Sequence, residues 1–326
     1  SKMKKDPMFV EKTSFNFREL SEPLSVLNMT YPSEEMDATS DEFAGVTANL
    51  HGKKGLDSIM TYERIAQPHE QIVNFEYRPD VLKTHGRIFQ MDSIGKFSCK
   101  IEAICRAIQN STGIVLIYSR YLEGGLLPMA LALEEMGFSR YSYSSHVRPF
   151  LKASKERSLL NPLTMKKKGP TDEFTAKYAM ITGTRLFSHN NELDLELIMN
   201  KSNSDGRHVK VVMISEAGSE GLDFKCIRQV HILDPWYNMS RIEQTIGRAV
   251  RNKSHCALPL KQRNVEIYMH GTVHDTDVET TDMYMYRLAE YKAIQIGQIT
   301  RIMKECAGDC LLNEKQNNFI EENMKT

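Results

Sequence analysis

Four residues in the second half of the chain combine side-chain types that suit phosphate chemistry. Gln244, Gly247, Arg248 and Arg251 form the string Q-x-x-G-R-x-x-R. On a helix, spacings of four and three residues would place Gln244, Arg248 and Arg251 on one face. Two forked, permanently charged guanidinium groups side by side favour an anionic partner such as a nucleotide phosphate. The alternative is a solvated basic face paired with Glu243 or another carboxylate, and spacing alone leaves both open.

A glycine-rich turn precedes this string. The apolar run 209–214 leads into S-E-A-G-S-E-G-L-D, residues 215–223. Two glycines allow backbone amides to approach a ligand closely, and Asp223 adds a carboxylate beside the turn. Taken alone, the turn is a weak signal.

Both motifs lie where apolar runs of strand length alternate with amphipathic segments. We expect five buried strands, at 113–118, 177–182, 209–214, 228–233 and 264–270. Helical spacing predicts helices over 126–138, 191–200 and 240–251, the last with Ser240 as its N-cap. Near-continuous apolar strands separated by helices are typical of a parallel sheet covered on both faces. The sequence therefore predicts a doubly wound α/β domain with ligand sites at the carboxyl ends of its strands.

The flanking segments follow other patterns. Residues 1–93 show no sustained period, and we recognise no strand in them. Residues 139–175 form a polar, basic insertion whose lysines either track a nucleic-acid backbone or belong to a solvated loop. Residues 281–306 place apolar side chains on one helical stripe, and we expect this helix to pack on its own domain.

Composition limits the classes of protein. Of 326 residues, 41% are hydrophobic, which is enough for one large domain or two medium ones. Lys plus Arg equals Asp plus Glu, at 42 each, so any nucleic-acid binding must come from a local surface. Six cysteines without a CxxC pair favour reduced thiols inside a cell over disulfides or a zinc site. No apolar run could span a bilayer, so we expect a soluble intracellular protein with no membrane partner and no metal site of its own.

Three strings resemble motifs of superfamily 2 helicases. EGLDF (220–224) resembles motif V, QTIGRAVR (244–251) motif VI and GIVLIYSR (113–120) motif IV, in the family's order. The resemblance covers roughly residues 94–275 and implies a RecA-like domain, the second of the two in such a motor. Residues 234–251 and 254–272 are most similar to helicases and NTPases of nucleocytoplasmic large DNA viruses, of the NTPase I and early-transcription-factor type. That similarity implies a role in viral transcription or genome processing, in the host cytoplasm or the virion.

The resemblance also implies an ATP site. It places six residues there: Gly221, Asp223, Gln244, Gly247, Arg248 and Arg251. Gly221 and Asp223 would lie at the ribose and phosphate edge. Arg248 and Arg251 would face the γ-phosphate, with Arg251 as the arginine finger, a group that raises phosphoryl-transfer rates about 10³ to 10⁵-fold.

For nucleic acid, the resemblance points to the ends of three strands. The residues are Ser119, Arg120, Gly183, Thr184 and Ser219. Small hydroxyls and exposed amides can hold sugar-phosphate oxygens without reading sequence. The implied ligand is a single strand, DNA rather than RNA. Trp236 matches a tryptophan shared with chromatin-remodeller motors, and we favour a partly buried packing role for it over base stacking.

Two parts of a complete ATP site are not found in the sequence. No G-x-x-x-x-G-K-[ST] string occurs, and no Asp-Glu-x-His type of motif follows an apolar strand to hold Mg²⁺. We therefore expect a first RecA-like domain of the same protein to hold most of the ATP and Mg²⁺. This chain would be an excised part, inactive by itself.

We expect three regions: 1–93 as a linker or accessory region after the missing domain, 94–275 as the RecA-like domain, and 276–326 as a helical extension. The competing interpretation is a non-catalytic module that binds nucleic acid or protein on the same fold. An unrelated α/β nucleotide enzyme is a third.

Overall fold

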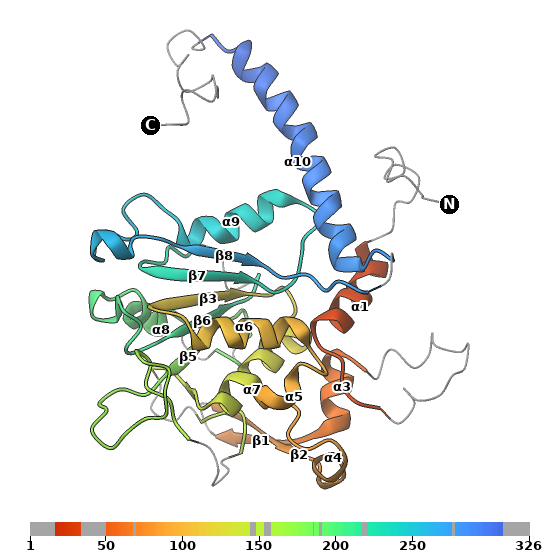
Figure 1. Ribbon diagram of the computed structural model, residues 1–326, viewed down its shortest axis with the longest axis vertical. Coiled ribbons are helices and arrows are strands. Elements are labelled where there is room, and N and C mark those ends of the chain that lie inside the picture. The colour runs from red at the N-terminus through yellow and green to blue at the C-terminus, as the bar shows by residue number, and fades with distance from the viewer. Residues whose placement is uncertain are drawn as a thin grey trace.

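A parallel sheet forms the centre of the molecule in the computed structural model, which describes residues 17–33, 50–67, 70–143, 148–152, 158–184, 186–188, 191–216, 221–275 and 278–308. Its order is β4-β5-β6-β3-β7-β8 (Figure 1). The strands are β3 (Ile114–Tyr118), β4 (Ser139–Arg140), β5 (Lys177–Ile181), β6 (Val211–Ile214), β7 (Ile227–Ile232) and β8 (Glu266–Met269). The first of them, β3, lies inside the sheet with later strands added on both sides, which confirms the predicted doubly wound α/β architecture.

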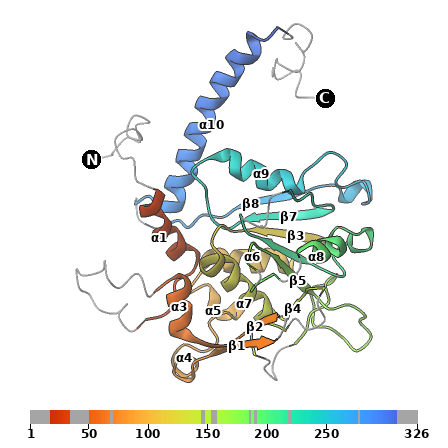
Figure 2. The ribbon, with the colours of Figure 1, turned by 180° about the vertical axis from the view of Figure 1, so that it is seen from behind.

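Helices cover both faces of this sheet, as the views from the front and from behind show (Figures 1 and 2). The helices are α5 (Met91–Ile94), α6 (Cys99–Gln109) and α7 (Leu127–Met136) on one face, and α8 (Asn191–Ile198) and α9 (Met239–Ala249) on the other. Successive side chains of β3 join different cores: Val115 packs with the first group of helices and Leu116 with the second. A strand with apolar neighbours on both faces must be apolar throughout, which is why these runs are continuous.

Strand β8 departs from the expectation of five buried strands. The runs that became β3, β5, β6 and β7 are largely buried, but every residue of β8 is exposed. β8 closes one edge of the sheet and pairs with β7. Its apolar run predicted a strand correctly, but local composition does not show which strand forms the edge of the sheet.

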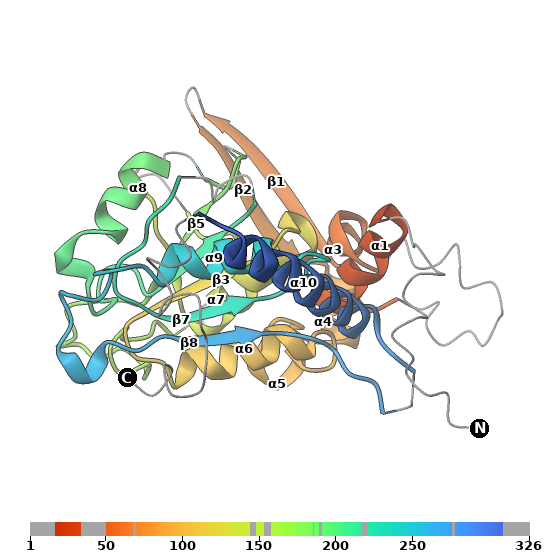
Figure 3. The same cartoon turned by 90° about the horizontal axis from the view of Figure 1, so that it is seen from above.

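The structure also corrects the account of residues 1–93. An antiparallel hairpin of β1 (Met60–Gln67) and β2 (Glu70–Tyr77) comes before the main sheet. The described part of this region also contains α1 (Phe17–Asn28), α3 (Gly52–Ile59) and α4 (Pro79–Thr84). Tyr31, Leu56 and Phe89 belong to the same hydrophobic core as α6 and α7. The described part of this region is therefore packed onto the sheet domain, and Figure 3 shows the hairpin beside it.

The basic insertion at 139–175 is described only in part. Lys155 and Arg157 lie outside the described residues. Lys152 is paired with Glu76 of β2, with 2.7 Å between Nζ and Oε2, so this lysine contacts the hairpin.

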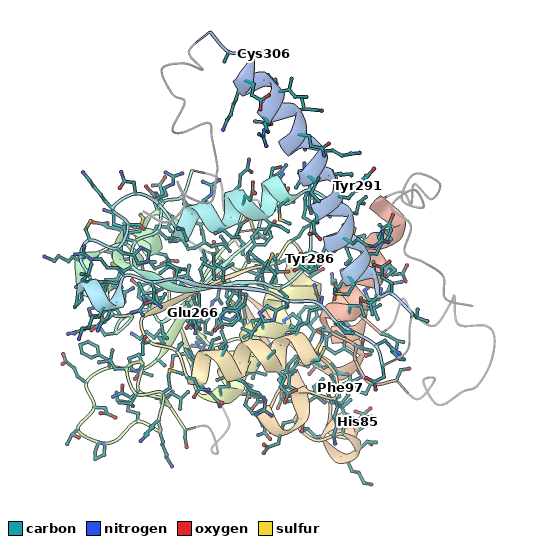
Figure 4. All side chains as sticks on the ribbon, turned by 45° about the horizontal axis from the view of Figure 1, so that its top comes forward. His85, Phe97, Glu266, Tyr286, Tyr291 and Cys306 are labelled. Atoms are coloured by element: carbon teal, nitrogen blue, oxygen red, sulfur yellow. The ribbon has the colours of Figure 1, made fainter. Side chains whose placement is uncertain are left out.

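Helix α10 (Thr281–Glu305), the last in the described part of the chain, packs on the domain through its first turns. Met285 and Ala289 are buried, and the Tyr286 hydroxyl donates to the His270 carbonyl at 3.0 Å. Farther along, Ile299 and Ile302 are both 60% exposed. Figure 4 shows Tyr286 near the body of the protein and Cys306 at the far end of the helix. The expected packing of this helix is therefore wrong for its later turns. Among the described helices, none is both long and apolar enough to cross a membrane.

Candidate nucleotide and nucleic-acid sites

The arginine-rich string lines a groove at the carboxyl ends of β3 and β6. The groove has a volume of about 620 Å³. Its lining residues are Tyr118, Glu216, Arg241, Gln244, Thr245, Gly247, Arg248, Val250 and Arg251. The structure therefore brings together all four residues of the Q-x-x-G-R-x-x-R string. They lie at the carboxyl ends of the strands, where a doubly wound fold binds its ligands.

The ends of α9 differ from the sequence expectation. Its N-cap is Asn238, whose side chain accepts a hydrogen bond from the Ser240 amide at 3.2 Å, so Ser240 is not the cap. The helix ends at Ala249, which leaves Arg251 just beyond it. Arg251 still reaches the groove, and its Nε donates to the Gly247 carbonyl at 3.3 Å.

The described end of the glycine-rich turn and the residue after it contact the arginines. Arg248 Nη1 donates to the Leu222 carbonyl at 3.2 Å, and the Phe224 amide donates to the Arg248 carbonyl at 2.9 Å. Arg251 Nη1 lies 3.4 Å from Asp223 Oδ2. Both partners of this ion pair are about half exposed, and such pairs contribute about 0–1 kcal/mol. An anionic ligand could displace Asp223 from Arg251 at little cost.

Glu216 of the turn lines the groove, whereas two later residues of the turn border it. Neither Gly221 nor Asp223 is among the lining residues. Gly221 has a φ of +74°, in the left-handed region that favours glycine. This conformation by itself favours glycine at the position, and the expected place of Gly221 beside ATP stays a prediction.

Sequence reasoning missed two charged groups of the groove, Arg241 and Glu216. Arg241 Nη1 lies 3.1 Å from Glu216 Oε1. Arg241 comes three residues before Gln244 and seven before Arg248, so helical spacing alone could have placed it on the same face. Glu216 carried no such signal, because it lies in the turn after β6. With Asp234, its carboxylate adds to the effect of burial in raising the pKa of Tyr118.

Arg120 lies between this groove and a second one. Its guanidinium carbon is 4.3 Å from the centre of the Trp236 ring, and its Nε is 3.9 Å from Glu216 Oε2. Trp236 also stacks on Tyr237, with ring centroids 5.0 Å apart. Trp236 is thus partly buried and packed against an arginine. Glu216 contacts Arg120 and Arg241, one arginine from each groove.

The second groove, of about 820 Å³, lies beside the carboxyl ends of β3 and β5 and is lined by Arg120 and Thr184. Gly183 and Thr184 are exposed in the turn after β5. Two expected nucleic-acid residues are thus in one groove and a third is exposed next to them.

Ser119 does not fit its expected role as a direct ligand. It is fully buried, and its hydroxyl donates to Asp234 Oδ1. The other carboxylate oxygen of Asp234 accepts from the Arg120 amide at 3.0 Å, and burial raises the pKa of Asp234. Ser119 and Asp234 therefore position the backbone at Arg120. The remaining expected residue, Ser219, lies outside the described residues.

A family model for the helicase conserved C-terminal domain matches residues 151–253. The match covers β5 to α9 and includes both Arg248 and Arg251. The chain therefore contains a region of the helicase C-terminal type.

Proteins similar to this chain include helicases of viruses. The chain is 29% identical over 230 residues, 70% of its length, to a candidate ATP-dependent RNA helicase of Acanthamoeba polyphaga mimivirus. Another mimivirus protein of that description is 39% identical over 124 residues, 36% of the chain. A termination factor NPH-I homologue of African swine fever virus is 32% identical over 187 residues, 54% of the chain. The chain is thus homologous to helicases of large DNA viruses.

These matches span a minor part of each relative: 35% and 15% of the two mimivirus proteins and 26% of the African swine fever virus protein. Among solved structures, the C-terminal part of the Fun30 ATPase domain aligns over 66% of this chain and 47% of its own, at 15% identity and a TM-score of 0.36. That likeness is too distant to carry an argument.

Proposed function

We propose that this chain supplies the second half of an ATP-dependent superfamily 2 motor that moves on single-stranded nucleic acid. The observation that carries the proposal is the groove in which Gln244, Gly247, Arg248 and Arg251 meet, inside the segment that matches the helicase C-terminal domain. The names of the relatives support ATP-dependent helicase activity in the whole protein.

In the proposed reaction, water attacks the γ-phosphorus of ATP and the bridging oxygen leaves with ADP. Arg248 and Arg251 would stabilise the negative charge that develops on the γ-phosphoryl oxygens. Arg251 would exchange its ion pair with Asp223 for the phosphate. Gln244 would help to order the site from the same face of α9.

A first RecA-like domain with a P-loop would hold the β- and γ-phosphates and the Mg²⁺ that accompanies ATP. Within the described ranges, no group of three His, Cys, Asp or Glu side chains is placed to hold a metal ion, and we assign no residue of this chain to Mg²⁺. Closure of the two domains on ATP and reopening after hydrolysis would move them along the strand, because each binds the backbone in a different state.

For the wider role, we propose viral transcription or genome processing in the infected host cell or the virion. The African swine fever virus relative, named as a termination factor homologue, supports transcription. The groove at Arg120 and Thr184 would take single-stranded nucleic acid, and we favour DNA over RNA. The mimivirus relatives are named as RNA helicases, so every binding test should include both single-stranded DNA and single-stranded RNA.

The proposal is tested by ATP hydrolysis, with and without single-stranded DNA, for this chain alone and for a chain extended by a P-loop motor domain. We expect ATP turnover only in the extended chain and none in this chain by itself. Arg251→Ala there should lower turnover by about 10³-fold or more while nucleotide binding persists. Arg106→Ala is the matched control, since Arg106 pairs with Glu102 on the surface of α6.

Two outcomes would contradict the proposal. Robust turnover by this chain alone would require a complete phosphate site within it. Undiminished turnover in Arg251→Ala would remove the arginine-finger role, and intact nucleic-acid binding without any turnover would favour the non-catalytic binding module.

A further inference from the structure

The groove at Arg120 and Thr184 has a second wall, built from residues that precede the sheet domain in sequence. His51, Lys53 and Lys54 line it from the start of α3. Sequence analysis placed no functional residue in this part of the chain. The groove therefore brings together side chains that are about 70 to 130 positions apart.

Hydrogen bonds and close packing hold this wall in place. His51 Nδ1 and the Ser25 hydroxyl of α1 are 3.1 Å apart, and His51 Nε2 is 3.5 Å from Glu22 Oε1. A Cβ added to Gly124, in the short π-helix Leu122–Leu126 that follows β3, would collide with the Ser25 hydroxyl. α1 and the start of α3 thus sit directly against the end of the strand that carries Arg120.

The charges in the groove favour an anionic occupant. Lys53 and Lys54 are both exposed, and within the described ranges neither forms an ion pair. Arg120 faces the same space. Two carboxylates also line it, Glu22 and Glu123, and Glu22 is next to His51. Among the residues that line this groove, three cationic side chains thus exceed two carboxylates.

We propose that Lys53 and Lys54 form the second wall of the nucleic-acid site and bind backbone phosphates of a single strand that runs past Arg120 and Thr184. This inference rests on the proposed function and assigns part of its nucleic-acid site to residues before the sheet. Lysine side chains act on phosphate as mobile point charges, so the wall adds affinity without reading sequence.

The test measures binding of fluorescein-labelled oligo(dT) and oligo(U) of equal length to the full chain. Fluorescence anisotropy monitors the binding at several salt concentrations. For single strands, each phosphate contact contributes about 0.7 to the slope of log K against log salt. Lys53→Ala/Lys54→Ala should therefore reduce the slope by about 1.4 and weaken binding about 25-fold at 0.1 M salt. Tighter binding of one oligonucleotide would show which of these two strands, the DNA or the RNA, the groove prefers.

The matched control is Lys83→Ala/Lys96→Ala, which removes the same charge from two exposed lysines outside the groove. We expect its affinity and slope to equal those of the unaltered chain. Since all four lysines are exposed, thermal unfolding should show that both variants remain folded.

Failure of the inference and failure of the proposed function are distinguishable. If the unaltered chain binds, Arg120→Ala weakens binding and Lys53→Ala/Lys54→Ala binds as before, the second wall is refuted and the proposed site stands. An equal loss in the control would also refute it, because only net charge would matter. Absence of binding to both oligonucleotides would overturn the inference and the nucleic-acid part of the proposed function.

Discussion

Among single residues, Gly247 is a position where fold stability and the proposed site favour different side chains. It lies inside α9 and lines the arginine groove, and a Cβ built there meets no atom within 4 Å. Glycine inside a helix is less stable than alanine by about 0.5–1 kcal/mol. Packing therefore gives no reason for glycine here, whereas close approach of a ligand would.

We expect Gly247→Ala to raise the free energy of unfolding by about 0.5–1 kcal/mol, measured by urea denaturation. In the extended motor, the same change should lower ATP turnover by up to about 10²-fold, because a methyl group in the groove would displace the nucleotide from the arginines.

Gly297→Ala is the matched control for this variant. Gly297 lies inside α10, is exposed and also has no atom within 4 Å of a built Cβ. Its replacement should leave turnover unchanged. Equal turnover in both variants would show that the nucleotide does not approach Gly247.

At the scale of elements, β7 and β8 are linked by a pair of histidines. His231 Nδ1 and His270 Nε2 are 3.0 Å apart, and the Tyr268 ring stacks on His231 with centroids 4.7 Å apart. Burial, with His270 as a second cause, lowers the pKa of His231 to about 3. Burial and the nearby Lys100 lower the pKa of His270 to about 4.

Stability should therefore fall in mild acid. Below the ordinary histidine pKa of about 6.5 the unfolded chain takes up protons that the folded pair does not. The free energy of unfolding should drop by up to about 1.4 kcal/mol per pH unit for each histidine as pH falls from about 6.5 toward 4.

His231→Gln/His270→Gln should flatten this part of the profile, in urea denaturation at pH 7 and pH 5. A profile as steep as that of the unaltered chain would assign the acid sensitivity to other groups.

Across the whole molecule, a buried ion pair joins segments far apart in sequence. Lys100 Nζ of α6 lies 2.6 Å from Asp282 Oδ2 of α10, and both side chains are at most 1% exposed. Lys100 also donates to Asn28 Oδ1 of α1 at 2.9 Å, and Asn28 in turn donates to Asp234. The network connects α1, α6 and α10 to the end of β7, next to Arg120.

We expect Asp282→Ala to lower the free energy of unfolding by about 3–5 kcal/mol, because Lys100 would remain buried without its partner. The double variant Lys100→Met/Asp282→Leu should recover most of this loss, since an apolar pair avoids the cost of burying charges. Urea denaturation of Lys100→Met, Asp282→Leu and the double variant measures the coupling. Losses that simply add in the double variant would show that the two groups do not stabilise each other.

Sequence patterns were most informative about local structure. Apolar runs such as 113–118 and 228–233 predicted β3 and β7, and helical spacing predicted α9, because period and length are properties of neighbouring residues. The same patterns could not show that β8 is an exposed edge or that α10 leaves the domain. An apolar stripe predicts which face of a helix is suited to burial. Whether another element covers that face depends on the rest of the fold.

The sequence by itself predicted that Gln244, Gly247, Arg248 and Arg251 lie close together, because all four belong to one short segment of the chain. Their assignment to ATP, like that of Arg120 and Thr184 to nucleic acid, stays a prediction. Only the tertiary structure placed Glu216 between two arginines, buried Ser119 against Asp234 and brought Lys53 and Lys54 into the groove that Arg120 lines. Such contacts join residues distant in sequence, and packing of the helices on the sheet decides them.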